Sequence, residues 1–220
     1  ARGLRRAGAK SQVVAASVDL KGLHMASDID FNRKSFTTGH TGFAMPFSTW
    51  PDRADVPRNA ARSLRYMDRF VTVTQGEVFY ATEMLAQLEG LERGPAGNVS
   101  LAAAFVLAQQ MDNDPTIVVQ ETEYSGAGKH PNAQLSFARQ MGIQVSSGDP
   151  RHSVPGRSII IPERPGQLSV KDVSLNDLRR SYISNALAEK GGEPLSETEI
   201  KFLCEDTRAD EEFVREFISR

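Results

Sequence analysis

The chain has 220 residues, of which 40% are hydrophobic and 25% are charged, and its formal net charge is −2. These proportions are those of an ordinary globular protein, and the near-neutral charge gives no basic footprint for nucleic acid or an anionic membrane. The longest apolar run, residues 101–108, is too short to cross a bilayer. The single cysteine, Cys204, excludes an internal disulfide framework and fits a reducing cytosol, so we expect a cytoplasmic location.

The N-terminal residues "ARGLRRAG" have the character of a helix end that Gly8 closes, with no helix start before it. We therefore expect the chain to be the C-terminal part of a longer protein. The next stretch, "QVVAASVDL" at residues 12–20, is a short apolar run that predicts a buried strand. Residues 21–65 are irregular but rich in aromatic side chains, which is typical of a functional loop.

Residues 70–90 predict a strand followed by a helix. Phe70, Val71 and Val73 indicate the strand, and Thr74 with Glu77 forms the T-x-x-E pattern of a capping box. Apolar residues then repeat at helical spacing over residues 76–89, and Gly90 ends the helix.

A second helix is predicted over residues 99–111, with Asn98 as its N-cap. It is apolar on every side, which predicts a buried helix. "TIVVQ" at residues 116–120 predicts another buried strand in the same sheet, and a helix is expected over residues 133–141, ended by Gly142. "IQVSS" and "SIIIP" are weaker strand candidates.

This alternation of strands and helices predicts an α/β fold, a three-layer α/β/α arrangement with a mainly parallel sheet. Residues 1–172 are expected to form the α/β domain. From residue 173 the character changes, and Ser174, Ser196 and Asp210 resemble helix starts. Residues 173–220 are therefore expected to be a helical appendage that packs on the domain or on a partner.

Three glycine-bearing polar segments would lie at the C-terminal ends of strands, where open α/β sheets bind ligands. They are "TTGHTGF", "RGPAGNVS" and "ETEYSGAGKH", at residues 37–43, 93–100 and 121–130. Glycines let the backbone approach a ligand, and amides at a helix start favour anions. Each segment could equally be an ordinary connection.

Other chemical motifs give weaker signals. "GAGK" is not a P-loop, because Glu123 and His130 stand where that pattern needs Gly and Ser or Thr. His40 could act as an acid or base, bind a carboxylate or make a structural hydrogen bond. The remaining histidines lack metal-ligand spacing, so no metal site is expected. Cys204 is expected to be a buried thiol.

The three segments, in this order, resemble the C-terminal half of fold-type II pyridoxal phosphate enzymes. "GHTGF" is similar to the family's glycine-rich loop, and "LEGLERGPAGNVSLAAA" is similar to its helix end, turn and alanine-rich helix. "TIVVQETEYSG" is similar to the strand that ends near the pyridine nitrogen. The sequence more closely resembles the β subunits of 2-amino-4-oxopentanoate thiolase, in "KSFTTGHTGF", "YMDRFVTVTQGEVFY" and "QETEYSGAGKHPNAQLSFAR".

The thiolase resemblance implies an activity and its partners. Family enzymes use pyridoxal 5'-phosphate and coenzyme A to cleave 2-amino-4-oxopentanoate to acetyl-CoA and alanine in ornithine fermentation. They combine this subunit with a small α subunit, so a hetero-oligomer is expected. Two alternatives stay open: another fold-type II lyase or β-replacement enzyme, and a noncatalytic ligand-binding subunit that keeps the fold.

The resemblance also implies which residues would hold the cofactor. The Schiff-base lysine and the phosphate loop should lie upstream, so no catalytic residue is expected in this chain, and alone it should be inactive. Thr122 aligns best with the residue that meets the pyridine nitrogen, and Ser100 is one of its alternatives. The full set of expected cofactor-binding residues is Gly39, His40, Thr41, Gly97, Asn98, Thr122 and Ser125.

Overall fold

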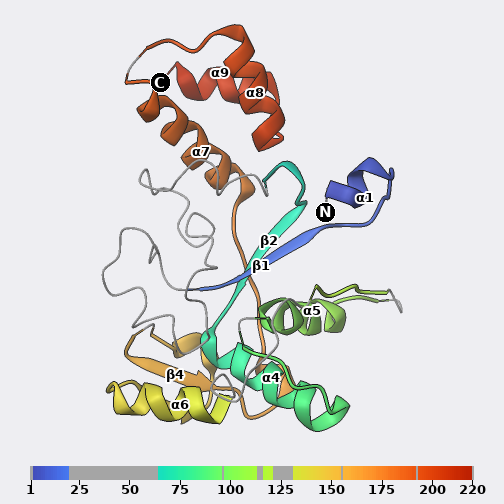
Figure 1. Cartoon of the computed structure of the whole chain (residues 1–220), viewed down its shortest axis with the longest axis vertical. Coiled ribbons are helices and arrows are strands. Elements are labelled where there is room, and N and C mark those ends of the chain that lie inside the picture. The colour runs from blue at the N-terminus through green and yellow to red at the C-terminus, as the bar shows by residue number, and fades with distance from the viewer. Residues whose placement is uncertain are drawn as a thin grey trace. The chain divides into compact units, whose positions relative to one another are not determined.

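The computed structural model describes residues 2–19, 64–95, 97–112, 116–120, 131–154, 156–191 and 193–219. Within these residues the chain divides into two compact units (Figure 1). Of the described residues, unit 1 comprises 2–15, 64–70 and those from 172 onward, and unit 2 comprises 16–19 and those between 71 and 171. The α/β character expected from the sequence is confirmed.

One three-stranded sheet has the order β1-β2-β5, with β1 at Val14–Val18, β2 at Arg69–Val73 and β5 at Lys171–Asp172. Each strand contributes residues to both units. Hydrogen bonds from Asp68 N to Val13 O and from Asp19 N to Val73 O show that β1 and β2 run in the same direction. β5 runs opposite to β2, because Val173 N bonds Phe70 O while Lys171 O accepts from the side chain of Thr72. The sheet is therefore mixed, where a mainly parallel one was expected.

Unit 2 contains a second, two-stranded sheet, which confirms the two weaker strand candidates. β3 at Gln144–Ser147 lies parallel to β4 at Ser158–Ile161, with Gln144 opposite Ser158. α6 at Pro131–Gln140 packs on this sheet and ends before Gly142, as expected (Figure 1). The shared core consists of Phe79, Leu135, Ala138, Ile143 and Ile159.

α4 at Gln75–Glu89 begins and ends where the sequence predicts. Thr74 Oγ accepts from Glu77 N, and the Glu77 carboxylate accepts from Thr74 N, so the capping box is confirmed. Gly90 closes the helix at φ 66°, a left-handed conformation that glycine adopts without steric cost. Gly76 fits against β4 so closely that a Cβ there would lie 1.8 Å from Ile160 O.

α5 at Val99–Gln109 packs against α4. Its buried residues are Val99, Ala102, Ala103, Val106 and Leu107, whereas residues 108–112 are exposed. The expectation of a helix buried over its whole length is therefore wrong at the C-terminal end. The physical reason is that the described residues provide no layer to cover that end.

The predicted strand at residues 116–120 is not assigned as a strand, so that expectation is also wrong for this chain. No backbone hydrogen bond joins this segment to another described segment, and Val118 is 89% exposed. A segment with high β propensity forms a strand only where a neighbouring strand can pair with it and another layer can cover it.

Unit 1 is formed around helices α7 at Leu175–Glu189, α8 at Glu197–Thr207 and α9 at Glu211–Ile218, which lie together (Figure 1). Ser174, Ser196 and Asp210 cap these helices, as expected. Their core side chains include Leu178, Ile183, Leu203 and Val214, which pack with Phe70.

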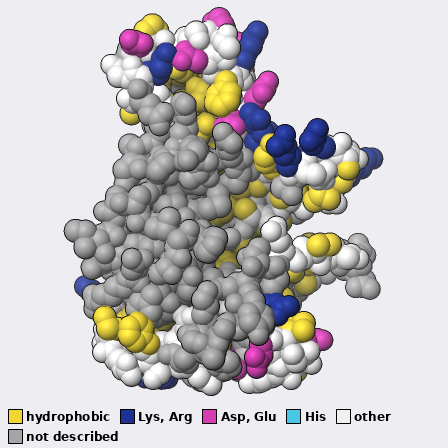
Figure 2. All heavy atoms as spheres, viewed as in Figure 1, with side chains coloured by type: hydrophobic (Ala, Val, Ile, Leu, Met, Phe, Trp, Pro, Cys, Tyr) yellow, Lys and Arg dark blue, Asp and Glu magenta, His cyan; other side chains and the backbone are white. Residues whose placement is uncertain are grey.

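The N-terminal end of unit 1 contributes α1 at Arg2–Arg6, whose arginines gather on the surface (Figure 2). Asp68 ties this end to the rest of the unit by accepting from Val13 N, Arg5 and Arg208. Burial raises the pKa of Asp68, but these hydrogen bonds outweigh it and hold that pKa below its usual value. None of the described helices is long and apolar enough to cross a membrane.

Candidate functional site

The expected cofactor-binding residues divide into two groups in the structure. Gly97 and Asn98 are described and lie at the start of α5. The other five, which the structure does not describe, stay predictions: Gly39, His40, Thr41, Thr122 and Ser125.

The turn before α5 brings a buried amide side chain to the helix start. Gly97 N and Asn98 N both bond Gly94 O, and this turn directs the chain into the helix. Asn98 is fully buried, and its backbone carbonyl accepts from Ala102 N. Asn98 thus occupies the expected N-cap position, but its side chain makes no capping hydrogen bond. The expected N-cap position is therefore confirmed, although its side chain is held elsewhere.

Asn98 is held by α4. Its Nδ2 donates to Thr82 Oγ1 at 3.1 Å, and Thr82 Oγ1 donates its own proton to Val78 O at 2.8 Å. Since the Thr82 hydroxyl has no second proton, it must accept from the amide, which fixes the orientation of Asn98. Sequence reasoning missed Thr82, which looks like any polar residue inside a helix.

Fixing the amide leaves the Asn98 side-chain oxygen without a partner. Among the described residues, Asn98 Oδ1 is buried and accepts no hydrogen bond. A buried acceptor left unpaired costs about 1–3 kcal/mol. Such an atom in a native site calls for an explanation, and a ligand with a hydrogen to donate is one.

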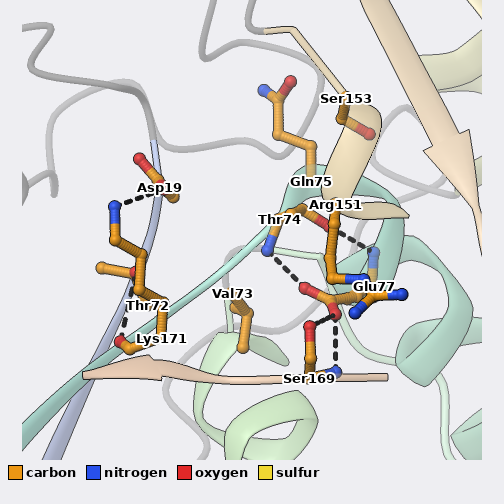
Figure 3. Close-up of a pocket in the computed structure, with 10 residues that line it drawn as sticks. All are labelled: Asp19, Thr72, Val73, Thr74, Gln75, Glu77, Arg151, Ser153, Ser169 and Lys171. Carbon is orange, nitrogen blue, oxygen red and sulfur yellow. Dashed lines mark hydrogen bonds and ion pairs between the residues drawn. The ribbon is translucent and has the colours of Figure 1, made fainter. Parts of the chain in front are cut away.

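A separate cavity of about 240 Å³ lies in unit 2, at the start of α4 (Figure 3). Neither Gly97 nor Asn98, the two described residues of the expected cofactor-binding set, lines it. Its described lining residues are Asp19, Thr72, Val73, Thr74, Gln75, Glu77, Arg151, Ser153, Ser169 and Lys171.

Glu77 is the buried acid of this cavity and is 1% exposed. One carboxylate oxygen accepts from Thr74 N at 2.6 Å, and the other accepts from Ser169 N at 2.7 Å and Ser169 Oγ at 3.0 Å (Figure 3). Burial raises the pKa of Glu77, and these hydrogen bonds only partly offset that rise. Glu77 therefore joins the start of α4 to a segment 92 residues further along the chain.

The cations of the cavity are already engaged by carboxylates. Arg151 Nε donates to Asp149 at 2.9 Å, and this pairing lowers the pKa of Asp149 to about 2. Lys171 lies 3.8 Å from Asp19 at the other side of the cavity (Figure 3). With its buried acid bonded and its cations paired, the cavity presents no activated nucleophile among its described residues.

Unit 1 has a second cavity of about 240 Å³, lined by Arg2, Arg65, Tyr66, Phe202 and Asp206. Asp206 is 5% exposed, accepts from Tyr182 Oη and lies 3.1 Å from Arg65. The positive charge of Arg65 balances the negative charge of the buried Asp206 carboxylate. Cys204, expected to be buried, is half-buried in this unit, and burial raises the pKa of its thiol. In the described part of the chain no group of three His, Cys, Asp or Glu residues could hold a metal.

Comparisons with known proteins give one consistent result. A protein named 2-amino-4-ketopentanoate thiolase beta subunit, from Acetoanaerobium sticklandii, is 64% identical over 215 residues. A second protein of that name, from an unknown prokaryotic organism, is 62% identical over 219 residues. The aligned residues cover 98% and 99% of this chain but only 46% of each relative. No family model matches the chain, and no solved structure matches it.

The compound in these names, 2-amino-4-ketopentanoate, is the 2-amino-4-oxopentanoate of the expected reaction. The resemblance seen in the sequence is therefore confirmed, and it extends through residues 173–220. The chain spans about half the length of the curated relatives it matches. Over nearly its whole length, this chain is similar to 2-amino-4-ketopentanoate thiolase beta subunits.

Proposed function

We propose that this chain is part of the β subunit of a pyridoxal phosphate-dependent thiolase. That enzyme would use coenzyme A to cleave 2-amino-4-oxopentanoate to acetyl-CoA and alanine. The observation that carries the proposal is 62–64% identity to two thiolase beta subunits over nearly the whole chain. Identity this high across both units extends far beyond the short motifs that related folds share.

Two parts of this proposal, the cofactor and the fold-type II architecture, are supported by the sequence resemblance. The environment of Asn98 supports the cofactor further. Pyridoxal phosphate, when bound, supplies an electron sink for the amino-acid substrate. Asn98 Oδ1 fits such a ligand, because it is buried, fixed in orientation and unpaired among the described residues. The start of α5 also has no side-chain cap, so its first amides are open to a polar group.

In this proposal the described residues orient the ligand and perform no covalent chemistry themselves. Thr82 would hold the Asn98 amide in place, and Asn98 Oδ1 would accept a hydrogen from the ligand. Gly97 would let the backbone approach closely. Thr122 stays the proposed partner of the pyridine nitrogen, and Gly39, His40, Thr41 and Ser125 the proposed neighbours of the ring.

We also propose that the active protein is a hetero-oligomer, in which a small α subunit joins the full-length β subunit in the cytoplasm. The β designation of both relatives supports this assembly. The Schiff-base lysine is proposed to lie in the part of the β subunit outside this chain, so the chain alone would be inactive.

The test is product analysis with the full-length β subunit and its α subunit. With coenzyme A and 2-amino-4-oxopentanoate, mass spectrometry should detect acetyl-CoA and alanine in equal amounts, and omitting coenzyme A should abolish both. Cleavage without coenzyme A would instead indicate another lyase. Absence of both turnover and bound cofactor would indicate a noncatalytic binding subunit.

A further inference from the structure

The cavity of unit 1 combines aromatic and basic side chains that the proposed cofactor site does not use. Its described lining residues come from α1, from the segment before β2 and from α8: Arg2, Arg65, Tyr66, Phe202 and Asp206. Two arginines and one aspartate give this lining a net charge of +1. Aromatic rings with a few placed polar groups are typical of small-molecule sites.

Arg65 is held in place at this cavity. Its Nη2 atom lies 3.1 Å from Asp206 Oδ1, and the same carboxylate accepts from Tyr182 Oη. Asp206 is buried, so water screens this ion pair weakly. Arg65 Nε is also buried and makes no hydrogen bond to a described residue. The guanidinium therefore keeps unused donors in a fixed position, which lowers the entropic cost of binding an acceptor.

Arg2 brings to the cavity a positive charge that no described residue pairs. Its side chain is exposed and makes no hydrogen bond or ion pair within the described part of the chain. Arg5, on the same helix, donates to Asp68 instead. Figure 2 shows the arginines of α1 at the surface of unit 1. A free guanidinium suits a phosphate group, because its planar set of donors matches phosphate oxygens.

Aromatic rings bind a nucleobase by stacking, and arginines bind its phosphates by charge-assisted hydrogen bonds. Of the two substrates in the proposed reaction, coenzyme A carries an adenine base and phosphates, whereas 2-amino-4-oxopentanoate carries neither. We therefore propose that this cavity binds the adenosine phosphate end of coenzyme A, an inference that rests on the proposed thiolase function. In this arrangement Tyr66 contacts the adenine, and Arg2 and Arg65 bind phosphate oxygens.

The volume of the cavity indicates how much of coenzyme A it holds. At about 240 Å³, it is smaller than the roughly 300–1,000 Å³ of pockets that enclose a whole drug-sized ligand. Coenzyme A is larger still, so only its nucleotide end fits, and the pantetheine arm with its thiol stays outside. The cavity residues thus bind the cosubstrate and take no part in the cleavage of carbon–carbon bonds.

Calorimetric titration with adenosine 3′,5′-bisphosphate tests the ligand. This compound carries the adenosine and the 3′-phosphate of coenzyme A but has no pantetheine arm. It should bind once per β subunit in the complex of full-length β and α subunits, and coenzyme A should displace it. Absence of binding, or binding that coenzyme A does not displace, would overturn the proposal.

A matched pair of arginine variants tests the place of binding. Arg2→Glu should weaken binding of the bisphosphate by about tenfold or more, because a charge-assisted hydrogen bond is replaced by repulsion. Arg6→Glu makes the same charge change at an exposed position of the same helix that does not line the cavity. Thermal unfolding confirms that both variants are folded. Equal affinities of the two variants would show a diffuse charge effect and overturn the assignment to this cavity.

The aromatic contact has its own pair of variants. Tyr66→Phe keeps the ring and should bind the bisphosphate like the wild type. Tyr66→Ser removes the ring and should weaken binding by about 5- to 150-fold, the range that stacking on one base contributes. Wild-type affinity in a folded Tyr66→Ser protein would remove adenine from this cavity and overturn the proposal.

Steady-state kinetics separates this inference from the proposed function. Arg2→Glu should raise the KM for coenzyme A more than it changes kcat, and its affinity for pyridoxal phosphate should match that of the wild type. If the wild type turns over and Arg2→Glu has an unchanged KM for coenzyme A, the cavity assignment is overturned and the thiolase function stands. If the wild type shows no turnover that depends on coenzyme A, the proposed function fails, and this inference fails with it.

Discussion

At the scale of single residues, Glu77 illustrates which interactions a sequence can predict. The bond between Thr74 and Glu77 is local and follows a known spacing, so the sequence predicts it. The bonds from Ser169 to the same carboxylate join residues 92 positions apart. A pattern of residue spacing cannot predict a contact over that separation. Asn98 shows the same limit, because its position was predictable and its partner Thr82 was not.

The buried carboxyl of Glu77 should leave a signature in the pH dependence of stability. Burial raises its pKa in the folded protein above the usual 4.5. A carboxyl with a raised folded pKa contributes stability below its unfolded pKa, and that contribution is lost as the pH rises through the folded value. Relative to Glu77→Gln, which cannot ionise, the wild-type protein should therefore lose stability as the pH increases from about 4.5.

Urea unfolding at a series of pH values measures this difference. Glu77→Ala is the control for the hydrogen bonds, because it should cost about 1–3 kcal/mol at every pH by leaving Thr74 N and Ser169 N unpaired. If the stability of wild type relative to Glu77→Gln stays constant or grows as the pH rises, the assignment of a raised pKa is wrong.

A second prediction concerns the backbone conformation and hydrogen bonds of Arg208. It ends α8 at φ 57°, and its guanidinium donates to Met67 O and to Asp68, both at 3.0 Å. Arg208→Ala loses these bonds and keeps the strained backbone, whereas Arg208→Gly loses the bonds but relieves the strain. Arg208→Gly should therefore be more stable than Arg208→Ala by about 1 kcal/mol. Thermal unfolding of the two variants compares them, and equal midpoints would show that this backbone conformation costs nothing.

At the scale of elements, helices with local start and stop signals were predicted well, and sheet partners were not. α4, α7 and α8 begin at the residues their caps indicate, because a cap depends on a few neighbouring residues. Residues 116–120 have strand composition but no strand partner among the described residues. β5 consists of only Lys171 and Asp172, which is too short for a recognisable strand pattern in the sequence. Its pairing with β2 also spans a long sequence separation, so no local pattern indicates it.

The contact of α4 with β4 should depend on Gly76. A methyl group there would lie 1.8 Å from Ile160 O, and backbone atoms on both sides leave little room to relax. Gly76→Ala should therefore destabilise the protein by about 3 kcal/mol, at the upper end of the usual cost of overpacking. Gly166→Ala is the matched control, because no atom lies within 4 Å of its Cβ position. Chemical denaturation of both variants decides the point, and similar small losses would contradict this close approach.

In the molecule as a whole, the C-terminal helices contribute to the core of unit 1, whereas the sequence left open whether they pack on the domain or on a partner. Ile200, Leu203 and Val214 belong to the core of unit 1, so deleting residues 193–220 would remove part of that core. Loss of assembly after such a deletion would not separate an interface from a folding defect. Phe202 offers a cleaner test of a role in assembly, because it is 46% exposed on α8.

If α8 contributes to the interface with the α subunit, Phe202→Ser should weaken that complex while the β subunit stays folded. Leu88→Ser, at an exposed position on α4, is the matched control and should leave the complex intact. Light scattering of each mixture measures the assembled mass. An unchanged mass for Phe202→Ser across a dilution series would remove α8 from the interface.

The affinity of the full-length β subunit for pyridoxal phosphate, determined by absorbance titration of the cofactor-free protein, shows whether Asn98 holds the cofactor. If Asn98 Oδ1 meets the cofactor, Asn98→Ala should weaken binding by about 5- to 150-fold, which corresponds to about 1–3 kcal/mol for a buried hydrogen bond. Gln109→Ala, at the exposed end of α5, should bind like the wild type, and unfolding of each cofactor-free variant separates binding from folding. Wild-type affinity in a folded Asn98→Ala protein, or no binding of pyridoxal phosphate by the wild type, would contradict the account.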